Sequence, residues 1–142
     1  MVNVGIKGSG IYLPERIVRN VELEEMLDLE SGFIEPRTGI RERRWSNEQE
    51  NVGYMASQAA LRATRNARIS KVDQLVIARD LIATRRAYSL GLEIMQELEK
   101  NGIDVSDCTS VDLCNYCPGF VHGTNIAQLM VRSGQANNVV VV

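Results

Sequence analysis

Residues 111–120, with the sequence VDLCNYCPGF, decide how the chain around them is organised. Residues 111–113, with the apolar Val111 and Leu113, predict the end of a strand. Pro118 predicts the start of a helix, because proline is favoured at the first helical position, where its missing N–H costs nothing. Cys117 would then be the N-cap or the residue beside it, at a strand-to-helix elbow, with Cys114 buried on the strand side. The positive helix end and its unpaired N–H groups favour the thiolate, the nucleophilic form of cysteine, and can stabilise an oxyanion beside it.

Hydrophobic patterning extends this strand-and-helix arrangement along the chain. We expect strands at 2–12, 74–78, 109–113 and 139–142, and helices at 20–27, 51–67, 88–100 and 118–132, with Asn20 as a helix cap and residues 28–50 irregular. This alternation predicts an α/β fold, with a mostly parallel sheet flanked by helices on both faces. The inward faces expected for the last three helices are Val52, Met55, Ala56, Ala59, Ala60 and Ala63; Leu90, Ile94 and Leu98; and Phe120, Thr124, Ala127 and Met130.

Composition limits the class of protein. The 142 residues are 44% hydrophobic and 24% charged, which suits one domain, spanning residues 1–142, with one core. A net charge of −2 gives no basic footprint for nucleic acid. No apolar run approaches the roughly 20 residues that cross a membrane, and no signal-peptide pattern begins the chain. Three cysteines, an odd number, argue against a secreted disulfide framework. We therefore expect a cytoplasmic protein that binds neither nucleic acid nor a membrane.

Three motifs resemble 3-oxoacyl-acyl-carrier-protein synthase III and its relatives in the thiolase superfamily. Asp112, Cys117, Gly119 and Phe120 match its nucleophile segment, RTGIRER at 37–43 is similar to its arginine-threonine-glycine-isoleucine signature, and GSGIYLP at 8–14 is similar to its first strand and turn. The motifs occur in the family's order and at about its spacing. Because the match covers only the first part of the family's length, and the chain ends in a strand-like run of four valines, we expect an incomplete N-terminal half of a thiolase-like fold.

The resemblance implies a condensing enzyme of fatty acid biosynthesis. Cys117 would take an acyl group from acyl-coenzyme A, and a malonyl-thioester would lose carbon dioxide and attack the acyl-cysteine. Arg37 and Thr38 would bind the nucleotide end of coenzyme A, and Phe33 holds the place of the tryptophan that stacks on the adenine. The resemblance further implies a homodimer that works with acyl carrier protein and needs no cofactor beyond the coenzyme A thioester, which is a substrate. The family's catalytic histidine and asparagine lie in its second half, where no residue of this chain matches them.

Other interpretations of the same residues stay open at this stage. Cys114 and Cys117 form a Cys-x-x-Cys dithiol pattern, and Cys108, Cys114, Cys117 and His122 have the ligand count of a zinc site, but at a spacing that matches no ligand pattern. We expect no metal. His122, rotated about 140° from Cys117 on a helix, is expected to be a partly exposed residue rather than a base. The arginines at 37–44 also suit a solvated loop. The function alternatives are simple acyl transfer by the same acyl-cysteine and a non-catalytic fragment or interaction subunit that keeps the fold.

Overall fold

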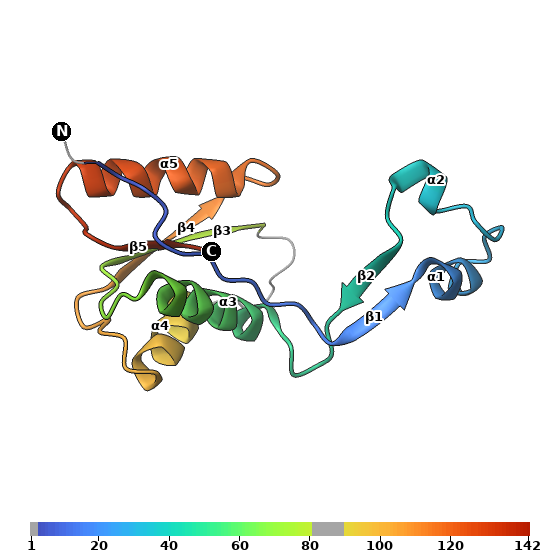
Figure 1. Cartoon of the computed structure of the whole chain (residues 1–142), viewed down its shortest axis with the longest axis horizontal. Coiled ribbons are helices and arrows are strands. Elements are labelled where there is room, and N and C mark those ends of the chain that lie inside the picture. The colour runs from blue at the N-terminus through green and yellow to red at the C-terminus, as the bar shows by residue number, and fades with distance from the viewer. Residues whose placement is uncertain (1–2, 81–89) are drawn as a thin grey trace. The chain divides into compact units, whose positions relative to one another are not determined.

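A computed structural model describes residues 3–80 and 90–142 of the chain. The chain forms two compact units, a larger one containing Val52–Val142 with the segment up to Tyr12, and a smaller one, Leu13–Asn51. The elements of each unit are labelled in Figure 1. The arginine-containing stretch at 81–89, and the first two residues of the helix expected at 88–100, lie outside the described residues. None of the described helices is long and apolar enough to cross a membrane.

A parallel sheet is the centre of the larger unit. It consists of β3 (Gln74–Arg79), β4 (Thr109–Cys114) and β5 (Val139–Val141) in the order β4-β3-β5. Both pairings are parallel, with Val76 of β3 opposite Val111 of β4 and Val141 of β5. The three strands predicted for this region and their parallel arrangement are thus confirmed. Among the terminal valines Val140 is buried, and the other three are half-buried.

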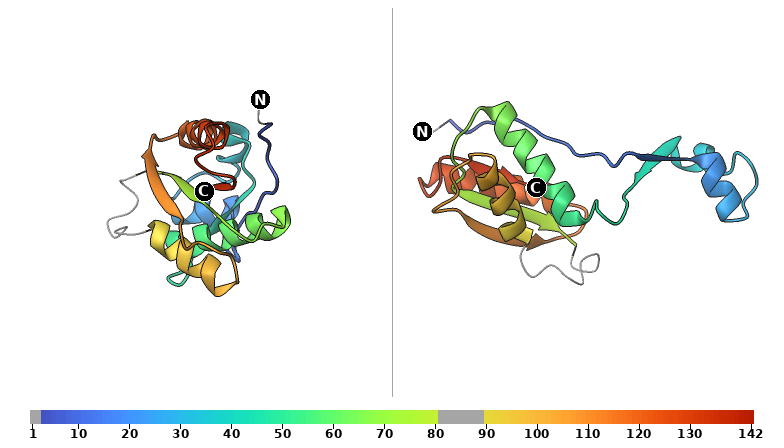
Figure 2. Two further views of the ribbon diagram at one scale, coloured as in Figure 1. Left: turned by 90° about the vertical axis from the view of Figure 1, so that its left-hand side faces the viewer. Right: turned by 90° about the horizontal axis from the view of Figure 1, so that it is seen from below.

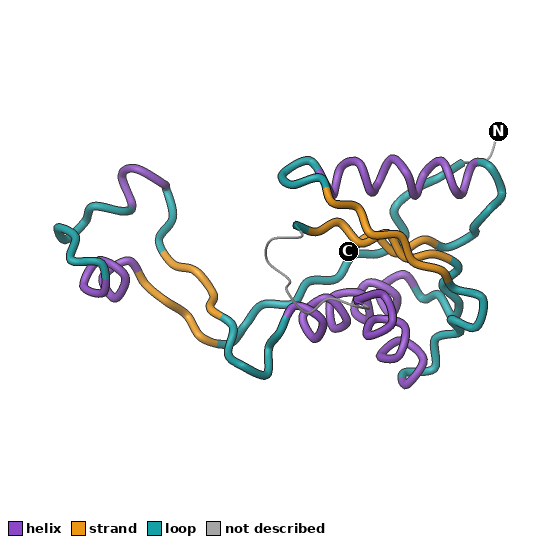
Figure 3. The backbone as a smooth tube through the Cα atoms, turned by 180° about the vertical axis from the view of Figure 1, so that it is seen from behind, coloured by secondary structure: helices purple, strands orange, loops and turns teal. Residues whose placement is uncertain are grey.

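Helices cover both faces of this sheet. Helices α3 (Val52–Ala67) and α4 (Leu90–Lys100) pack together on one face, and α5 (Gly119–Arg132) lies on the other, which makes three layers (Figures 1 and 3). The main core lies between the sheet and the α3–α4 layer. Its largest fully buried side chains include Leu75, Ile77, Ile94 and Leu98. The inward face predicted for α4 is confirmed, since Leu90, Ile94 and Leu98 are all buried.

The predicted face of α3 is only partly right. Ala60 is buried as expected, but the buried stripe is Gly53, Ser57, Ala60, Leu61 and Thr64, and Val52 is exposed. Ala59 and Ala63 instead meet the N-terminal segment. A Cβ placed on Gly10 would lie 2.2 Å from the carbonyl oxygen of Ala59, and one on Gly8 would lie 2.8 Å from that of Ala63. The small residues of α3 therefore pack against two neighbours, the sheet and this segment.

The first strand expected at 2–12 is wrong for the described residues 3–12, which form no strand. The segment runs beside α3, as Figure 2 shows, and side chains of that helix bind its carbonyl groups. Arg62 Nη1 donates to the oxygen of Ile11 at 2.6 Å, and Asn66 Nδ2 donates to that of Ser9 at 2.7 Å. A strand needs a neighbouring strand to satisfy its backbone groups, and here helix side chains satisfy two of them.

The inward face of α5 also differs from expectation. Gly119, Gly123 and Ala127 are buried, whereas Phe120 is 61% exposed. A Cβ on Gly123 would lie 3.1 Å from Cγ1 of Val141 and 3.2 Å from Cγ1 of Val76. The glycine lets the helix axis approach β3 and β5 closely. Phe120, in the first turn of the helix, is therefore not part of the core as expected.

The smaller unit contains a two-stranded antiparallel ribbon of β1 (Arg16–Arg19) and β2 (Glu42–Trp45), with α1 (Asn20–Met26) and α2 (Glu35–Thr38) between them. The helix expected at 20–27 is confirmed, but residues 28–50 are not irregular throughout, because α2 and β2 lie there. Asn20 is not the helix cap, which is Arg19. Its side chain is buried instead, donating to the oxygen of Ile40 at 2.7 Å and accepting from Arg43 Nη2 at 2.7 Å. It therefore joins α1 to β2.

Candidate functional site

Cys117 lies in the elbow between β4 and α5. The strand ends at Cys114, the helix begins at Gly119, and Tyr116 between them has φ +42°, in the left-handed region. This conformation is uncommon for a residue with a large side chain and marks local backbone strain. The N–H of Gly119 donates to the oxygen of Tyr116 at 3.0 Å, which closes the turn. The expected strand-to-helix elbow is confirmed.

The helix begins one residue later than Pro118 predicts. Pro118 is the N-cap rather than the first helical residue, since its carbonyl accepts the N–H of His122 at 3.0 Å as the first bond of the helix. Cys117 is therefore the residue beside the cap, one of the two positions expected, and its side chain is exposed. No acidic residue lies in the first turn of α5. The partial positive charge of the helix end is thus not neutralised locally.

The three cysteines differ in their surroundings. Cys108 is half-buried, and burial, followed by the nearby charge of Asp73, raises the pKa of its thiol to about 11. Cys114, expected to be buried, is exposed. The physical reason is that β4 is one of the two edge strands of the sheet and is little covered by the helices, so that only Leu113 among its residues is half-buried. Cys114 and Cys117 are both exposed, so accessibility does not identify the nucleophile. Their positions differ, because Cys114 lies in the strand, opposite Arg79, and Cys117 lies beside the helix cap.

His122 is exposed on α5, as predicted. Its Nδ1 is paired with the side-chain amide of Asn115, a residue of the elbow that the sequence analysis did not single out. Across residues 3–80 and 90–142, no group of three or more potential ligands could hold a metal ion. Cys108, Cys114, Cys117 and His122 are accordingly not assembled into a zinc site.

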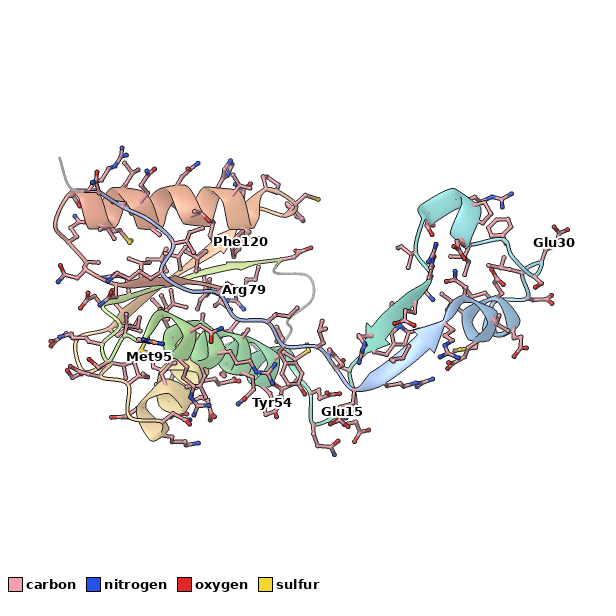
Figure 4. All side chains as sticks on the ribbon, in the orientation of Figure 1. Glu15, Glu30, Tyr54, Arg79, Met95 and Phe120 are labelled. Atoms are coloured by element: carbon pink, nitrogen blue, oxygen red, sulfur yellow. The ribbon has the colours of Figure 1, made fainter. Side chains whose placement is uncertain are left out.

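An ion pair joins the carboxyl ends of β3 and β4 beside the elbow. Arg79 Nη2 lies 2.7 Å from Oδ2 of Asp112, and the arginine side chain, labelled in Figure 4, is only 11% exposed. Ligands of parallel α/β sheets bind near the carboxyl ends of the strands, so the pair lies at the edge where a site is expected. Asp112 belongs to the nucleophile motif, whereas Arg79 was missed, because only the strand pairing brings it opposite this segment.

The smaller unit brings Phe33 and Arg37 together. The guanidinium carbon of Arg37 lies 3.8 Å from the centre of the Phe33 ring, a cation–π contact, and its Nη1 donates to the Phe33 oxygen at 2.9 Å. Phe33 is half-buried and Arg37 exposed. The two residues to which the family resemblance assigns adenine and phosphate therefore form one platform, made of a ring and a guanidinium.

Thr38 lies next to this platform, with its hydroxyl bonded to local backbone. It donates to the oxygen of Ile34 at 2.8 Å and accepts the N–H of Ile40 at 3.1 Å. Gly39, with φ +69°, ends α2 there. The hydroxyl thus stabilises the turn that follows Arg37.

The other arginines of the 37–44 run do not form a purely solvated loop. Arg41 pairs with Glu35 at 3.0 Å at the surface. Arg43 and Arg44, by contrast, donate to carbonyl groups of Val18 and Pro14 at 3.4 and 3.0 Å. These last two side chains therefore tie β2 to the β1 side of the unit.

Comparison with known proteins supports the resemblance predicted from the motifs. No family model matches the chain. It is 36% identical over 138 residues to the beta-ketoacyl-[acyl-carrier-protein] synthase III of Aquifex aeolicus, covering 96% of this chain and 43% of the relative. The corresponding synthase of Fusobacterium nucleatum is 33% identical over 147 residues, covering 100% of this chain and 42% of the relative. The resemblance is confirmed over nearly the whole chain, which spans less than half the length of these curated relatives.

Solved structures give the same result for the fold. The priming beta-ketosynthase from the R1128 polyketide biosynthetic pathway matches with a TM-score of 0.84 and 31% identity, over 96% of this chain and 40% of that one. The 3-oxoacyl-[acyl-carrier-protein] synthase III from Aquifex aeolicus matches with a TM-score of 0.75 and 33% identity, over 96% and 42%. The predicted α/β, thiolase-like fold is therefore confirmed for the part of those proteins that the chain covers.

Proposed function

We propose that this chain is the nucleophile-bearing part of a condensing enzyme of the 3-oxoacyl-acyl-carrier-protein synthase III type. The observation that carries the proposal is Cys117, which lies at a strained elbow before a helix end that has no side-chain capping hydrogen bond. The similarity to synthases of that name along nearly the whole chain supports it. Thiols beside helix N-termini have the electrostatic surroundings of reactive cysteines.

The first chemical step is acyl transfer to Cys117. Its thiolate attacks the carbonyl carbon of an acyl-coenzyme A, the bond to the coenzyme A sulfur breaks, and the leaving thiolate takes up a proton. The backbone N–H of Cys117 supplies part of the oxyanion hole for the tetrahedral intermediate. A malonyl-thioester on acyl carrier protein then loses carbon dioxide, and its carbanion attacks the acyl-cysteine and releases the thiolate. By the family resemblance, this second step uses a histidine and an asparagine that no residue here matches.

Coenzyme A is a substrate in this proposal, and no further cofactor is needed. Phe33 offers its ring to the adenine, and Arg37 offers its planar fork to a phosphate, for which two hydrogen bonds at once are the favoured geometry. Thr38 contributes through the turn that it stabilises. From the same resemblance we further propose a cytoplasmic, homodimeric enzyme of fatty acid synthesis.

Condensation should require polypeptide beyond these 142 residues. Helix α5 exposes Phe120, Val121 and Leu129 by 61%, 62% and 65%. Large apolar side chains exposed in this way suit a surface that another part of a protein covers. The relatives are more than twice as long as the chain that matches them. We infer that further polypeptide, in the same chain or as a partner subunit, packs there and completes the site.

Acylation tests the proposal directly. The purified chain, verified as folded, is incubated with acetyl-coenzyme A, and its intact mass and peptide map are measured. An acetyl adduct on Cys117, absent from Cys117→Ala, is expected. The alternative of a non-catalytic interaction subunit is supported by the short coverage of the relatives, and a folded chain that stays unmodified would favour it. Transfer from the adduct to an alcohol or amine, but not to a malonyl-thioester in the presence of the remaining polypeptide, would indicate a simple acyltransferase.

A further inference from the structure

Glu24 places a buried carboxylate beneath the loop that carries Phe33. Only 3% of this residue is exposed, although it is a glutamate on the short surface helix α1. Its Oε2 accepts the N–H of Gly32 at 2.9 Å, and its Oε1 accepts the N–H of Ile34 at 3.0 Å. Both oxygens therefore bind backbone N–H groups on either side of Phe33, 8 and 10 residues further along the chain.

The loop that Glu24 holds also begins the helix of Arg37. Ile34 is the N-cap of α2 and is itself buried. Its carbonyl accepts the N–H of Arg37 at 3.2 Å, and the N–H and hydroxyl of Thr38 at 3.1 and 2.8 Å. Fixing Ile34 thus fixes the first turn of α2. The position of the Arg37 guanidinium over the Phe33 ring depends on that turn.

A buried charge here has a cost that only these hydrogen bonds offset. Glu24 lies in the second half of α1, where the helix dipole disfavours negative charge, and removal of a carboxylate from water is unfavourable unless it is bound. The N–H groups of Ile34 and Gly32, helped by that of Phe33 and the charge of Arg43 on β2, nevertheless hold the pKa of the Glu24 carboxyl below its usual value. The residue is ionised at neutral pH and makes two charge-assisted hydrogen bonds to the loop.

We propose that Glu24 is a positioning residue for the nucleotide end of coenzyme A. It holds the backbone on both sides of Phe33 and thereby keeps the ring and the Arg37 guanidinium stacked, without contacting the ligand itself. This inference rests on the proposed function, in which Phe33 and Arg37 bind coenzyme A.

The test is a titration of the 142-residue chain with coenzyme A. Glu24→Gln keeps the size of the side chain but replaces one accepting oxygen by an amide NH₂, which cannot accept the loop N–H. We expect the Kd to rise about tenfold, the effect of losing one hydrogen bond to a charged group. Glu25→Gln is the matched control, since Glu25 is the exposed neighbour on the same helix, and its Kd should stay that of the unaltered chain.

A double variant separates positioning from a general loss of structure. If Glu24 acts through the platform, E24Q combined with R37A should lose less binding than the sum of the two single losses, because the contribution of Arg37 is already lost. Additive losses would overturn the inference.

Trp45, the chain's single tryptophan, lies in β2 of the same unit and reports on its fold. Unchanged Trp45 emission in E24Q is expected, and emission typical of an unfolded chain would show that Glu24 holds the whole unit, which also overturns it.

The remaining outcomes distinguish this inference from the function on which it rests. If R37A weakens binding but E24Q binds like the unaltered chain, Glu24 is not a positioning residue and the proposed function stands. If the unaltered chain does not bind coenzyme A, or R37A binds as well as it does, the proposed roles of Phe33 and Arg37 fail and this inference fails with them.

Discussion

Gly123 controls how closely α5, and with it the Cys117 elbow, approaches the sheet. A Cβ at this position would lie 3.1 and 3.2 Å from methyl groups of Val141 and Val76, against about 3.5–4.0 Å for ordinary carbon contacts. Gly123→Ala therefore forces α5 or both strands to move by a few tenths of an ångström. Such overpacking costs about 1–3 kcal/mol, whereas replacing glycine by alanine inside a helix gains about 1 kcal/mol. We expect a net loss in the free energy of unfolding of about 0–2 kcal/mol.

Gly119→Ala is the matched control, because Gly119 lies on the same face of α5 but a Cβ there would meet only the Cβ of Ala78, at an ordinary 3.5 Å. Urea unfolding at 25 °C, followed by circular dichroism, gives the free energy of unfolding for both variants. Since both exchange glycine for alanine in one helix, their difference isolates most of the overpacking cost, and G123A should be less stable than G119A by about 1–3 kcal/mol. Equal stabilities, or a more stable G123A, would refute the close approach of α5 to β3 and β5.

Three further predictions concern the site. Alkylation at neutral pH should label Cys117 first and Cys108 last, because Cys117 lies at the helix end and the pKa of Cys108 is raised to about 11; peptide mapping that finds Cys114 labelled ahead of Cys117 would contradict the assignment of the nucleophile. Arg37→Ala should weaken coenzyme A binding at least about tenfold, since a hydrogen bond to a charged group contributes roughly 1.5–3 kcal/mol, and an unchanged Kd by calorimetry would reject its role. The ionised Glu24 stabilises the smaller unit above the unfolded-state carboxyl value of 4.5, and this contribution is lost as the pH falls through the lower folded pKa; urea unfolding followed by Trp45 emission should give a midpoint that falls with pH in the unaltered chain and falls less in Glu24→Gln, whose emission without urea stays native.

Local patterns in the sequence were sufficient for much of the larger unit. The β-branched and apolar runs that form β3, β4 and β5 are short and bounded by turn residues, and Leu90, Ile94 and Leu98 recur at helical spacing on α4. Pro118 marks the end of the elbow within one residue, because its fixed φ and missing N–H restrict the backbone wherever it occurs. The nucleophile candidate Cys117 follows from this local geometry and from the motif around it.

Long-range contacts decided the features that the sequence could not predict. Residues 3–12 lack a neighbouring strand and are held by side chains of α3. Cys114 is exposed because β4 is an edge strand that the helices cover little, and neither strand order nor helix packing is a local property. Phe120 is exposed, whereas Gly123 makes the close contact of α5 with the sheet, and which residues of a helix meet a sheet depends on tertiary packing.

The same division holds for the proposed coenzyme A platform. The signature that begins at Arg37 is visible in the sequence, but its stacking on Phe33 is set by the loop between α1 and α2. Nothing in the local pattern distinguishes Glu24 from its neighbour Glu25, since both are glutamates on one short helix. In the folded chain the N–H groups of residues 32 and 34 meet Glu24 and not Glu25. Such donors need an acceptor once they are removed from water. The sequence thus determined which residue types are present for the chemistry, and tertiary hydrogen bonding determined which of them hold the platform in place.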